Sequence, residues 1–439
     1  MLENREIYKT LDLCLRIGEV LLSSGAGAAD VTATMLSISH GLGLRNADVD
    51  VTFTALSMSY QQSFDEPALI QVRNVRHRDI DYEDLTEVDL IITEVVTGDI
   101  DREEARQRLA QIVSSGHRLP RWAVTVGWGM SGVGIGLLLG GDLIVVAIAF
   151  LAAAGIEVIK RAMSRRRLPA FYQQVAGGFF ATSLAVVAAA TDLPVDPSLV
   201  VTANIIMLLA GIGFMGAIQD ALSGFYITAG ARILEALLAT AGIIAGVSGG
   251  LTLGQMIGVG LEELRPGISG WQDLPVMAFG AGLAAAAFAF ACYAPFRSLL
   301  PIAGVAALGQ SLWYVVFTQD PGRAWAAAPA SILIGVISYA VAGRVRVPPL
   351  VIVVPAVVPL LPGLSIYRGL SLMSVGDSYG IVALATAAAV AISIASGVIL
   401  GEYIAQPLKR EARRLEDRLA GPRLVGPLRA RAVKRQKQD

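Results

Sequence analysis

The sequence predicts an α-helical polytopic membrane protein, with about ten transmembrane helices in two five-helix inverted repeats behind a small α/β cytoplasmic domain. Of the 439 residues, 54% are hydrophobic and 16% are charged, whereas soluble domains carry about a quarter charged residues. Apolar stretches of about 20 residues, the length that crosses a bilayer, recur from Trp122 onward. Two similar stretches lie five predicted spans apart, which indicates a repeat.

Changes in composition divide the chain into parts. An acidic segment gives way to nearly uncharged sequence and then to a basic tail. The charged start lacks the apolar core of a signal peptide, which favours a cytoplasmic amino terminus. The predicted parts are a cytoplasmic α/β domain at 1–120, a first five-helix repeat at 121–261, a second at 262–405 and a basic cytoplasmic tail at 406–439.

The first part combines helical periodicity with one alternating stretch. Apolar residues at 49–55 alternate with polar ones, which predicts a half-buried strand, and 68–75 is its expected neighbour. The predicted helices lie at about 7–22, from after 24–25 to 40–43, at 82–96, and from Asp99 or Asp101 onward.

Histidines and cysteines offer no motif for metal or catalytic chemistry. The three histidines, His40, His77 and His117, all lie in the first part, and their spacing matches no metal-ligand pattern. We interpret them as surface residues. Cys14 and Cys292 are too far apart in sequence to indicate a disulfide framework, so both are interpreted as small apolar residues. No metal or other cofactor is predicted.

The apolar stretches and the basic residues between them predict a topology. Lys160, Arg161 and Arg165 follow the second span, whereas the opposite loops hold far fewer cations, chiefly Arg265, Arg323 and Arg368. The positive-inside rule then predicts that both termini lie in the cytoplasm. The membrane in question is expected to be the inner membrane of the cell. The predicted spans lie near 122–140, 142–159, 171–190, 198–218, 232–250, 274–292, 299–317, 324–343, 349–367 and 380–402.

A repeat relates spans four and nine. Residues 207–216 (MLLAGIGFMG) resemble residues 359–369 (PLLPGLSIYRG). Halves of five crossings each must run in opposite directions, as in the inverted repeats of secondary transporters. Their sites lie on helices broken near the membrane midplane, so we expect breaks near Ala210-Gly211 and Pro362-Gly363. The alternative is that small and proline residues only permit close helix packing.

Candidate substrate-binding residues follow from these breaks. Arg368, with Ser365 and Tyr367, offers donors that suit a carboxylate. Polar residues within spans, such as Asn204 and Gln310, can hydrogen-bond a substrate or equally a neighbouring helix. The full predicted set is Pro362, Gly363, Ser365, Tyr367, Arg368, Gly211, Gly213 and Asn204.

Candidate proton-coupling residues lie where span four ends and span five begins. Asp220 closes span four, and Arg232 and Glu235 open span five within one helical turn. A charge at membrane depth is costly and usually has a task, so Asp220 or Glu235 is expected to carry a proton, with Arg232 as its partner. Snorkelling of these side chains to the membrane surface is the competing interpretation.

The chain resembles a known family. The amino-terminal pattern Gly18, 21–26 (LLSSGA), Val31 and 41–44 (GLGL), together with 362–369 (PGLSIYRG), is similar to the threonine/serine exporter family over nearly the whole chain. This resemblance implies proton-driven export of small hydroxy amino acids. Relatives that split the two halves between two polypeptides are associated with dicarboxylates such as succinate, which is the alternative substrate. Relatives tend to have Pro-Gly where this chain has Ala210-Gly211, so the resemblance supports the break in span nine more than the one in span four.

Other function classes are disfavoured. None of the lysines follows a glycine as a Walker A loop requires, and no histidine occurs after His117, so neither an ATP-driven pump nor a membrane-embedded enzyme is expected. A channel, or a membrane anchor for the soluble domain, stays open as an alternative. The expected partners are a small-molecule substrate, protons and the lipid bilayer, without nucleic acid. Assembly into a homo-oligomer is also left open.

Overall fold

A computed structural model describes residues 2–63, 65–75, 80–191, 199–201, 203–204, 208, 210–256, 258, 270–319, 322–374 and 377–419. Of the residues discussed above, His77 and Arg265 lie outside this set, as does the end of the basic tail. Side chains are also not described at Ala210, Gly211, Gly363 and Tyr367.

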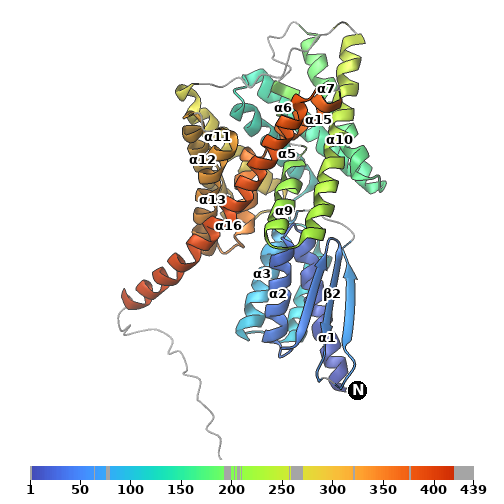
Figure 1. The fold of residues 1–439 in the computed structure, drawn as a ribbon, viewed down its shortest axis with the longest axis vertical. Coiled ribbons are helices and arrows are strands. Elements are labelled where there is room, and N and C mark those ends of the chain that lie inside the picture. The colour runs from blue at the N-terminus through green and yellow to red at the C-terminus, as the bar shows by residue number, and fades with distance from the viewer. Residues whose placement is uncertain are drawn as a thin grey trace, which may run out of the picture.

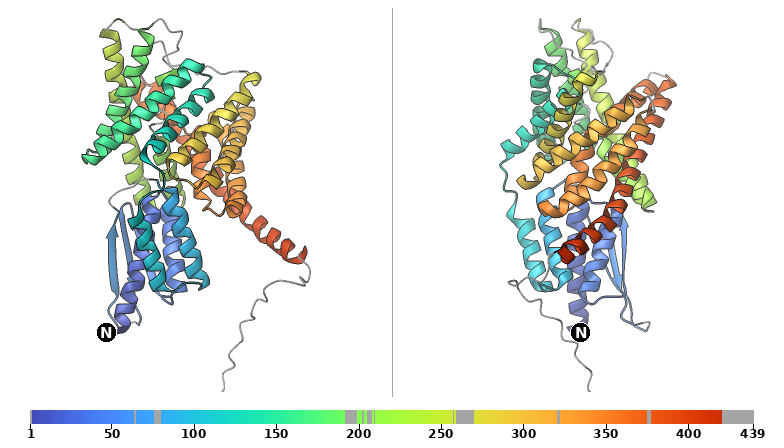
Figure 2. Two further views of the ribbon diagram at one scale, coloured as in Figure 1. Left: turned by 180° about the vertical axis from the view of Figure 1, so that it is seen from behind. Right: turned by 90° about the vertical axis from the view of Figure 1, so that its left-hand side faces the viewer.

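The amino-terminal elements form a sheet covered by helices on one face. Helices α1 and α2 pack on the sheet, and α3 and α4 pack against α1 (Figures 1 and 2). The elements are α1 (Leu2–Ser23), α2 (Ala28–Gly41), β1 (Ala47–Thr52), β2 (Ala55–Tyr60), β3 (Leu69–Asn74), α3 (Tyr82–Thr97) and α4 (Arg102–Ser115).

The sheet differs from the prediction in its pairing. Strand β2 lies between β1 and β3 and is antiparallel to both, so the 68–75 stretch is not the neighbour of the first strand. The alternation at 49–55 crosses a two-residue turn at Phe53 and Thr54, where Phe53 has a φ of 51°. This turn contains no glycine, proline or asparagine, so the sequence carried no ordinary turn signal there.

Acidic side chains fix the starts of helices α3 and α4. The Asp81 carboxylate accepts a hydrogen bond from the backbone N–H of Asp84, and Asp101 accepts one from Glu104. These caps satisfy amide groups that have no partner within the helix. Gly98 ends α3 in the left-handed conformation, as glycine commonly does.

The remainder of the chain is a bundle of apolar helices, and every predicted span overlaps one or more of them. Among the described residues, six helices are long and apolar enough to cross a membrane: 143–165, 226–256, 271–291, 296–317, 323–345 and 379–406. The elements are α5 (Arg121–Leu138), α6 (Leu143–Arg165), α7 (Ala170–Ala189), α9 (Ala210–Leu222), α10 (Tyr226–Met256), η1 (Trp271–Asp273), α11 (Leu274–Ala291), α12 (Phe296–Phe317), α13 (Arg323–Val345), α14 (Leu350–Val357), η2 (Val358–Leu360), α15 (Gly363–Ser374) and α16 (Tyr379–Leu419).

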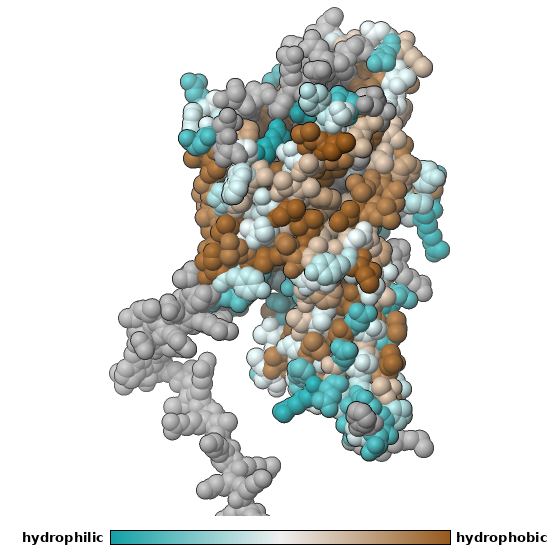
Figure 3. All heavy atoms as spheres, viewed as in Figure 1, coloured by the Kyte–Doolittle hydropathy of each residue, from teal (hydrophilic) through white to brown (hydrophobic). Residues whose placement is uncertain are grey.

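The outside of this bundle is apolar. Leu143 and Leu300 expose 86% and 82% of their surface, which suits contact with lipid rather than water. Figure 3 shows hydrophobic residues over the helical bundle and more hydrophilic residues over the amino-terminal elements below it. Small residues bring helices close together: a side chain at Gly134 would overlap the backbone of Ala284 between α5 and α11.

The helix of predicted span nine is broken. Helix α14 ends at Val357, η2 tightens into a 3-10 turn at Pro359, and Leu361 is extended with a ψ of 139°. A new helix, α15, then starts at Gly363, so the break lies at Pro362-Gly363 as the sequence predicts. Helix α9 starts at Ala210 and contacts α15, and both contact α16.

Candidate functional site

A cavity of about 230 Å³ lies at the break between η2 and α15. Its walls come from the ends of α5 and α12, the starts of α11 and α13, the broken segment itself and Val390 of α16. Helix α12 begins beside the amino-terminal elements and ends at the cavity, so the cavity lies toward the end of the bundle remote from those elements. The lining residues are Leu138, Leu139, Met277, Gln310, Trp313, Tyr314, Phe317, Arg323, Pro359, Leu360, Leu361, Pro362, Ser365 and Val390.

Two polar side chains in this cavity have unsatisfied atoms. The Gln310 and Tyr314 side chains are each 4% exposed, and neither Oε1 of Gln310 nor the Tyr314 hydroxyl has a hydrogen-bond partner among the described residues. Leaving such groups unpaired costs about 1–3 kcal/mol each. A polar ligand that bonds to both would remove this cost.

Another part of the cavity wall carries positive charge. Nη1 of Arg323 lies 3.5 Å from the hydroxyl oxygen of buried Ser365. Arg368, one turn further along α15, is close enough for its charge to act on Arg323. The first backbone N–H groups of α15, from Gly363 onward, have no hydrogen-bond acceptor within their own helix. A carboxylate placed here would meet a guanidinium and the positive end of a helix dipole.

Residues of predicted span four approach this cavity. Ala203 belongs to the same buried cluster as Leu138, Met277 and Tyr314, three residues of the cavity wall. Asn204 is fully buried and donates through Nδ2 to the carbonyl of Val200 at 2.7 Å, while its Oδ1 has no partner among the described residues. Asn204 does not line the cavity.

The predicted substrate set is therefore divided. Pro362 and Ser365 line the cavity, Arg368 does not line it, and Gly213 is exposed on α9. The backbones of Gly211, Gly363 and Tyr367 lie in α9 and α15, but their side-chain surroundings are outside the described part.

The predicted coupling residues lie elsewhere, where α9 and α10 meet the amino-terminal elements. Oδ2 of Asp220 is 2.6 Å from Nη1 of Arg232, and both side chains are buried. Oδ1 of Asp220 accepts a hydrogen bond from the backbone N–H of Ala28. Glu235 is exposed, one turn along α10 from Arg232.

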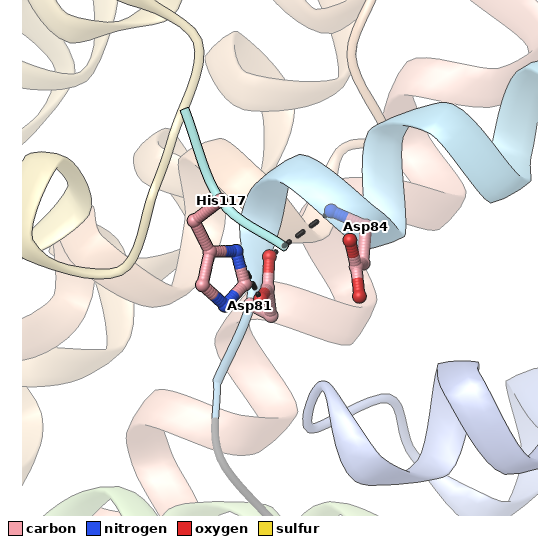
Figure 4. Close-up of side chains that lie close together, drawn as sticks. All are labelled: Asp81, Asp84 and His117. Atoms are coloured by element: carbon pink, nitrogen blue, oxygen red, sulfur yellow. Dashed lines mark hydrogen bonds and ion pairs between the residues drawn. The ribbon is translucent and has the colours of Figure 1, made fainter. Parts of the chain in front are cut away.

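A third group contains His117, which the sequence presented as an isolated surface residue. Nδ1 of His117 lies 3.3 Å from Oδ2 of Asp81 (Figure 4). The His117 ring also stacks on Tyr293, with 3.8 Å between the ring centroids. The potential ligand atoms of Asp81, Asp84 and His117 lie within 4.8 Å of one another. Burial, reinforced by the charge of Asp81, raises the pKa of Asp84 to about 6. Both Asp81 oxygens already have protein partners, so we interpret this group as a contact between segments.

Three cavity residues are absent from the predicted set. In the sequence, Gln310 is one of several polar residues within spans, Arg323 is a loop cation, and Tyr314 carries no signal beyond its hydroxyl group. The arginine follows Pro321-Gly322 at the start of a span. Its position one step after a helix-breaking pair was the signal that a site argument could have used.

Comparison with known proteins assigns both halves of the chain to one kind of protein. A family model described as "Putative threonine/serine exporter" matches residues 12–254, and one described as "Threonine/Serine exporter, ThrE" matches residues 277–404. The chain is 33% identical over 424 residues to the "Probable threonine/serine exporter" of Mycobacterium tuberculosis, covering 94% of this chain and 80% of the relative. It is also 33% identical over 418 residues to the "Threonine/serine exporter" of Corynebacterium glutamicum, covering 94% and 85%.

A more distant relative matches one half only. The "Probable succinate transporter subunit YjjP" of Escherichia coli is 25% identical over 244 residues, which is 55% of this chain and 93% of the relative. No solved structure matches the chain.

Proposed function

This chain belongs to the threonine/serine exporter family, and we propose that it exports threonine and serine across the inner membrane in exchange for protons. It is a multi-pass membrane protein, and its relatives are named as exporters and transporters rather than enzymes. The observation that carries the proposal is the cavity at the break of span nine, which combines a cationic wall with two polar groups that have no partner among the residues that the structure describes.

Each functional group of a hydroxy amino acid has a suitable partner in the cavity. The substrate carboxylate binds Arg323 and Ser365 at the start of α15, where charge-assisted hydrogen bonds are strongest. The ammonium group donates to Oε1 of Gln310, and the side-chain hydroxyl bonds to Tyr314. Arg368 adds positive charge near the carboxylate. The apolar wall around Met277 and Leu360 contacts the methyl group of threonine.

Succinate is the second candidate, since the Escherichia coli relative is named for its transport. The closeness of Arg323 and Arg368 favours it, because two cations suit two carboxylates. An acceptor such as Gln310 Oε1 suits an ammonium group instead. Arg368→Lys keeps the charge but loses the planar fork of the guanidinium. If both substrates bind, this change should weaken the binding of succinate more than the binding of threonine.

The topology that supports export has ten spans in two inverted halves with both termini in the cytoplasm. The basic loops predicted to be cytoplasmic and the break in span nine support it. The cavity then lies toward the outer face. A cysteine placed at 165–167 should be inaccessible to a membrane-impermeant reagent in intact cells; labelling from outside would exclude this topology.

Glu235 is the better of the two proposed proton carriers. Asp220 would have to give up bonds to Arg232 and to Ala28 in order to take a proton. Glu235 lies one helical turn from this pair and is exposed. A carboxylate there can change its protonation without breaking the buried ion pair.

Efflux from loaded cells tests the proposed substrate. Cells that express the protein and are loaded with radiolabelled threonine should release it faster than cells with an empty vector, and unlabelled serine should compete. Release of succinate alone would favour the second candidate. Equal release without any solute preference would favour a channel, and no release would leave the membrane part as an anchor.

A further inference from the structure

The tip formed by α9 and α10 holds the amino-terminal elements through buried polar contacts. The Asp220 carboxylate is 2.6 Å from Arg232 and accepts from Ala28 N–H at 2.9 Å. Arg232 in turn donates through Nη2 to the carbonyl of Ala26 at 3.5 Å. Figure 1 shows α9 and α10 reaching down to α2 and the sheet.

Asp220 supplies a cap that α2 lacks. The N-cap position of α2 is Gly27, which has no side chain to accept from the first amide groups. A carboxylate from 192 residues further along the chain takes that place. Because the cap comes from α9, the start of α2 is completed only while the amino-terminal elements are docked.

A second contact fixes the hairpin turn to the same tip. The hydroxyl of buried Thr228, in the first turn of α10, accepts from Phe53 N–H at 3.0 Å. It lies 3.3 Å from the carbonyl oxygen of Val51, to which it donates. The turn at Phe53 therefore has its unusual conformation stabilised from the membrane part.

The same elements also contact the second half of the chain. The backbone N–H of Tyr82 donates to the carbonyl of Cys292 at 2.9 Å, and His117 stacks on Tyr293. Cys292 and Tyr293 connect α11 to α12. The amino-terminal elements thus bridge α9–α10 in the first half and the α11–α12 connection in the second.

We propose that the Asp220–Arg232 pair is a latch that docks the amino-terminal domain, and that the docked domain restrains the two halves of the transporter relative to each other. The restraint rests on the proposed transport function, whereas the docking does not. Alternating access requires the halves to move against each other, so the latch limits the rate of the cycle. Asp220 is then a positioning residue and carries no proton.

The native cysteines provide a test. Cys292 is buried at the junction, and Cys14 is buried in the core of the amino-terminal domain. Maleimide labelling of the purified full-length protein, located by mass spectrometry, reports undocking at Cys292 and unfolding at Cys14. In Asp220→Ala and in Arg232→Ala, the rate of maleimide labelling at Cys292 should rise roughly tenfold or more over the wild type, because either change leaves a buried charge unpaired. Cys14 should stay protected in both variants.

Two further variants keep the test decisive. Thr228→Val conserves shape and removes only the hairpin contact, so it should accelerate Cys292 labelling in the same direction. Asp142→Asn, which keeps the cap of α6, is the matched control and should change nothing. An unchanged rate of Cys292 labelling in Asp220→Ala would overturn the latch. The latch would also be overturned if both cysteines became labelled in Asp220→Ala and Thr228→Val had no effect on Cys292.

Export supplies the second readout. Release of the latch should raise the maximal rate of threonine export and leave its KM unchanged, since Asp220 does not line the cavity. Faster Cys292 labelling with an unchanged maximal rate would overturn the restraint while leaving the docking in place. If the wild-type protein exports no threonine, the labelling result still decides the latch, so the two failures are distinct.

Discussion

Arg323 and Ser365 meet across the cavity wall, with Nη1 of the arginine 3.5 Å from the serine hydroxyl. Arg323 starts α13, whereas Ser365 lies in the first turn of α15, so the contact joins two helix starts at the break. A guanidinium and the first turn of α15, whose dipole is positive at that end, thus lie together in the cavity wall.

The first prediction concerns the carboxylate position proposed beside this contact. Arg323→Gln should raise the KM for threonine export about ten- to hundredfold, because a charge-assisted hydrogen bond contributes about 1.5–3 kcal/mol. The matched control is Arg344→Gln at the other end of α13, where the side chain bonds to its own helix at Ala340. Initial rates of efflux over a range of internal threonine concentrations measure both. Equal KM values in the two variants would remove Arg323 from the site.

A second prediction separates the hydroxyl of the substrate from the rest. Tyr314→Phe removes a hydroxyl that has no partner within the described part of the chain, and it should slow threonine export roughly three- to tenfold, the effect of one neutral hydrogen bond. Export of 2-aminobutyrate, which lacks the hydroxyl, should be unaffected and serves as the internal control. A parallel loss for both substrates would show that Tyr314 acts on the structure of the cavity rather than on the hydroxyl.

Proton coupling gives the third prediction. Glu235→Gln should leave threonine binding intact but remove the dependence of export on the pH difference, since the variant cannot exchange a proton. Asp142→Asn, an acidic residue at a helix start outside the proposed pathway, is the control. The measurement is efflux at several external pH values at one internal pH. A pH profile that matches the wild type would exclude Glu235 as the carrier.

The fourth prediction concerns stability near His117. In the folded protein the pKa of Asp84 is raised from 3.8 to about 6, by burial first and by Asp81 second. The folded state therefore holds a proton that the unfolded state releases, and stability falls as pH rises from about 4 to about 6.

Asp84→Asn cannot ionise and should remove that loss. Its thermal midpoint should equal that of the wild type at pH 4 and exceed it at pH 7 to 8. Thermal unfolding of the purified protein at these pH values is the measurement, with Asp99→Asn as an exposed acidic control. A variant less stable than the wild type at pH 7 would show that the Asp84 carboxylate makes a favourable contact when ionised.

Elements governed by local patterns were predictable from the sequence. Helices α1 to α4 and the break at Pro362-Gly363 lie where periodicity, caps and prolines place them. The turn at Phe53 was not predicted, because its conformation depends on Thr228, which lies 175 residues away. Because this turn divides the 49–55 stretch between β1 and β2, the predicted neighbour of the first strand was wrong as well.

The site was predictable only in part, since its walls come from α5, α11, α12, α13, the break between η2 and α15, and α16. Proline and glycine marked the broken segment with Ser365, but nothing local to Gln310, Tyr314 or Arg323 shows that they converge on it. The sequence left Asp220 and Glu235 as alternative partners of Arg232, and the structure pairs Arg232 with Asp220. Their contact with Ala26 and Ala28 depends on how two parts of the chain dock, which sequence spacing does not reveal.

Reconstituted vesicles with an acidic lumen test the central claim most directly. Protein inserted with its amino-terminal domain outside should accumulate external radiolabelled threonine against its gradient as protons leave, and an uncoupler should abolish the accumulation. Serine should compete and succinate should not. Threonine that only equilibrates across the membrane, with or without the uncoupler, would contradict proton-coupled amino-acid export.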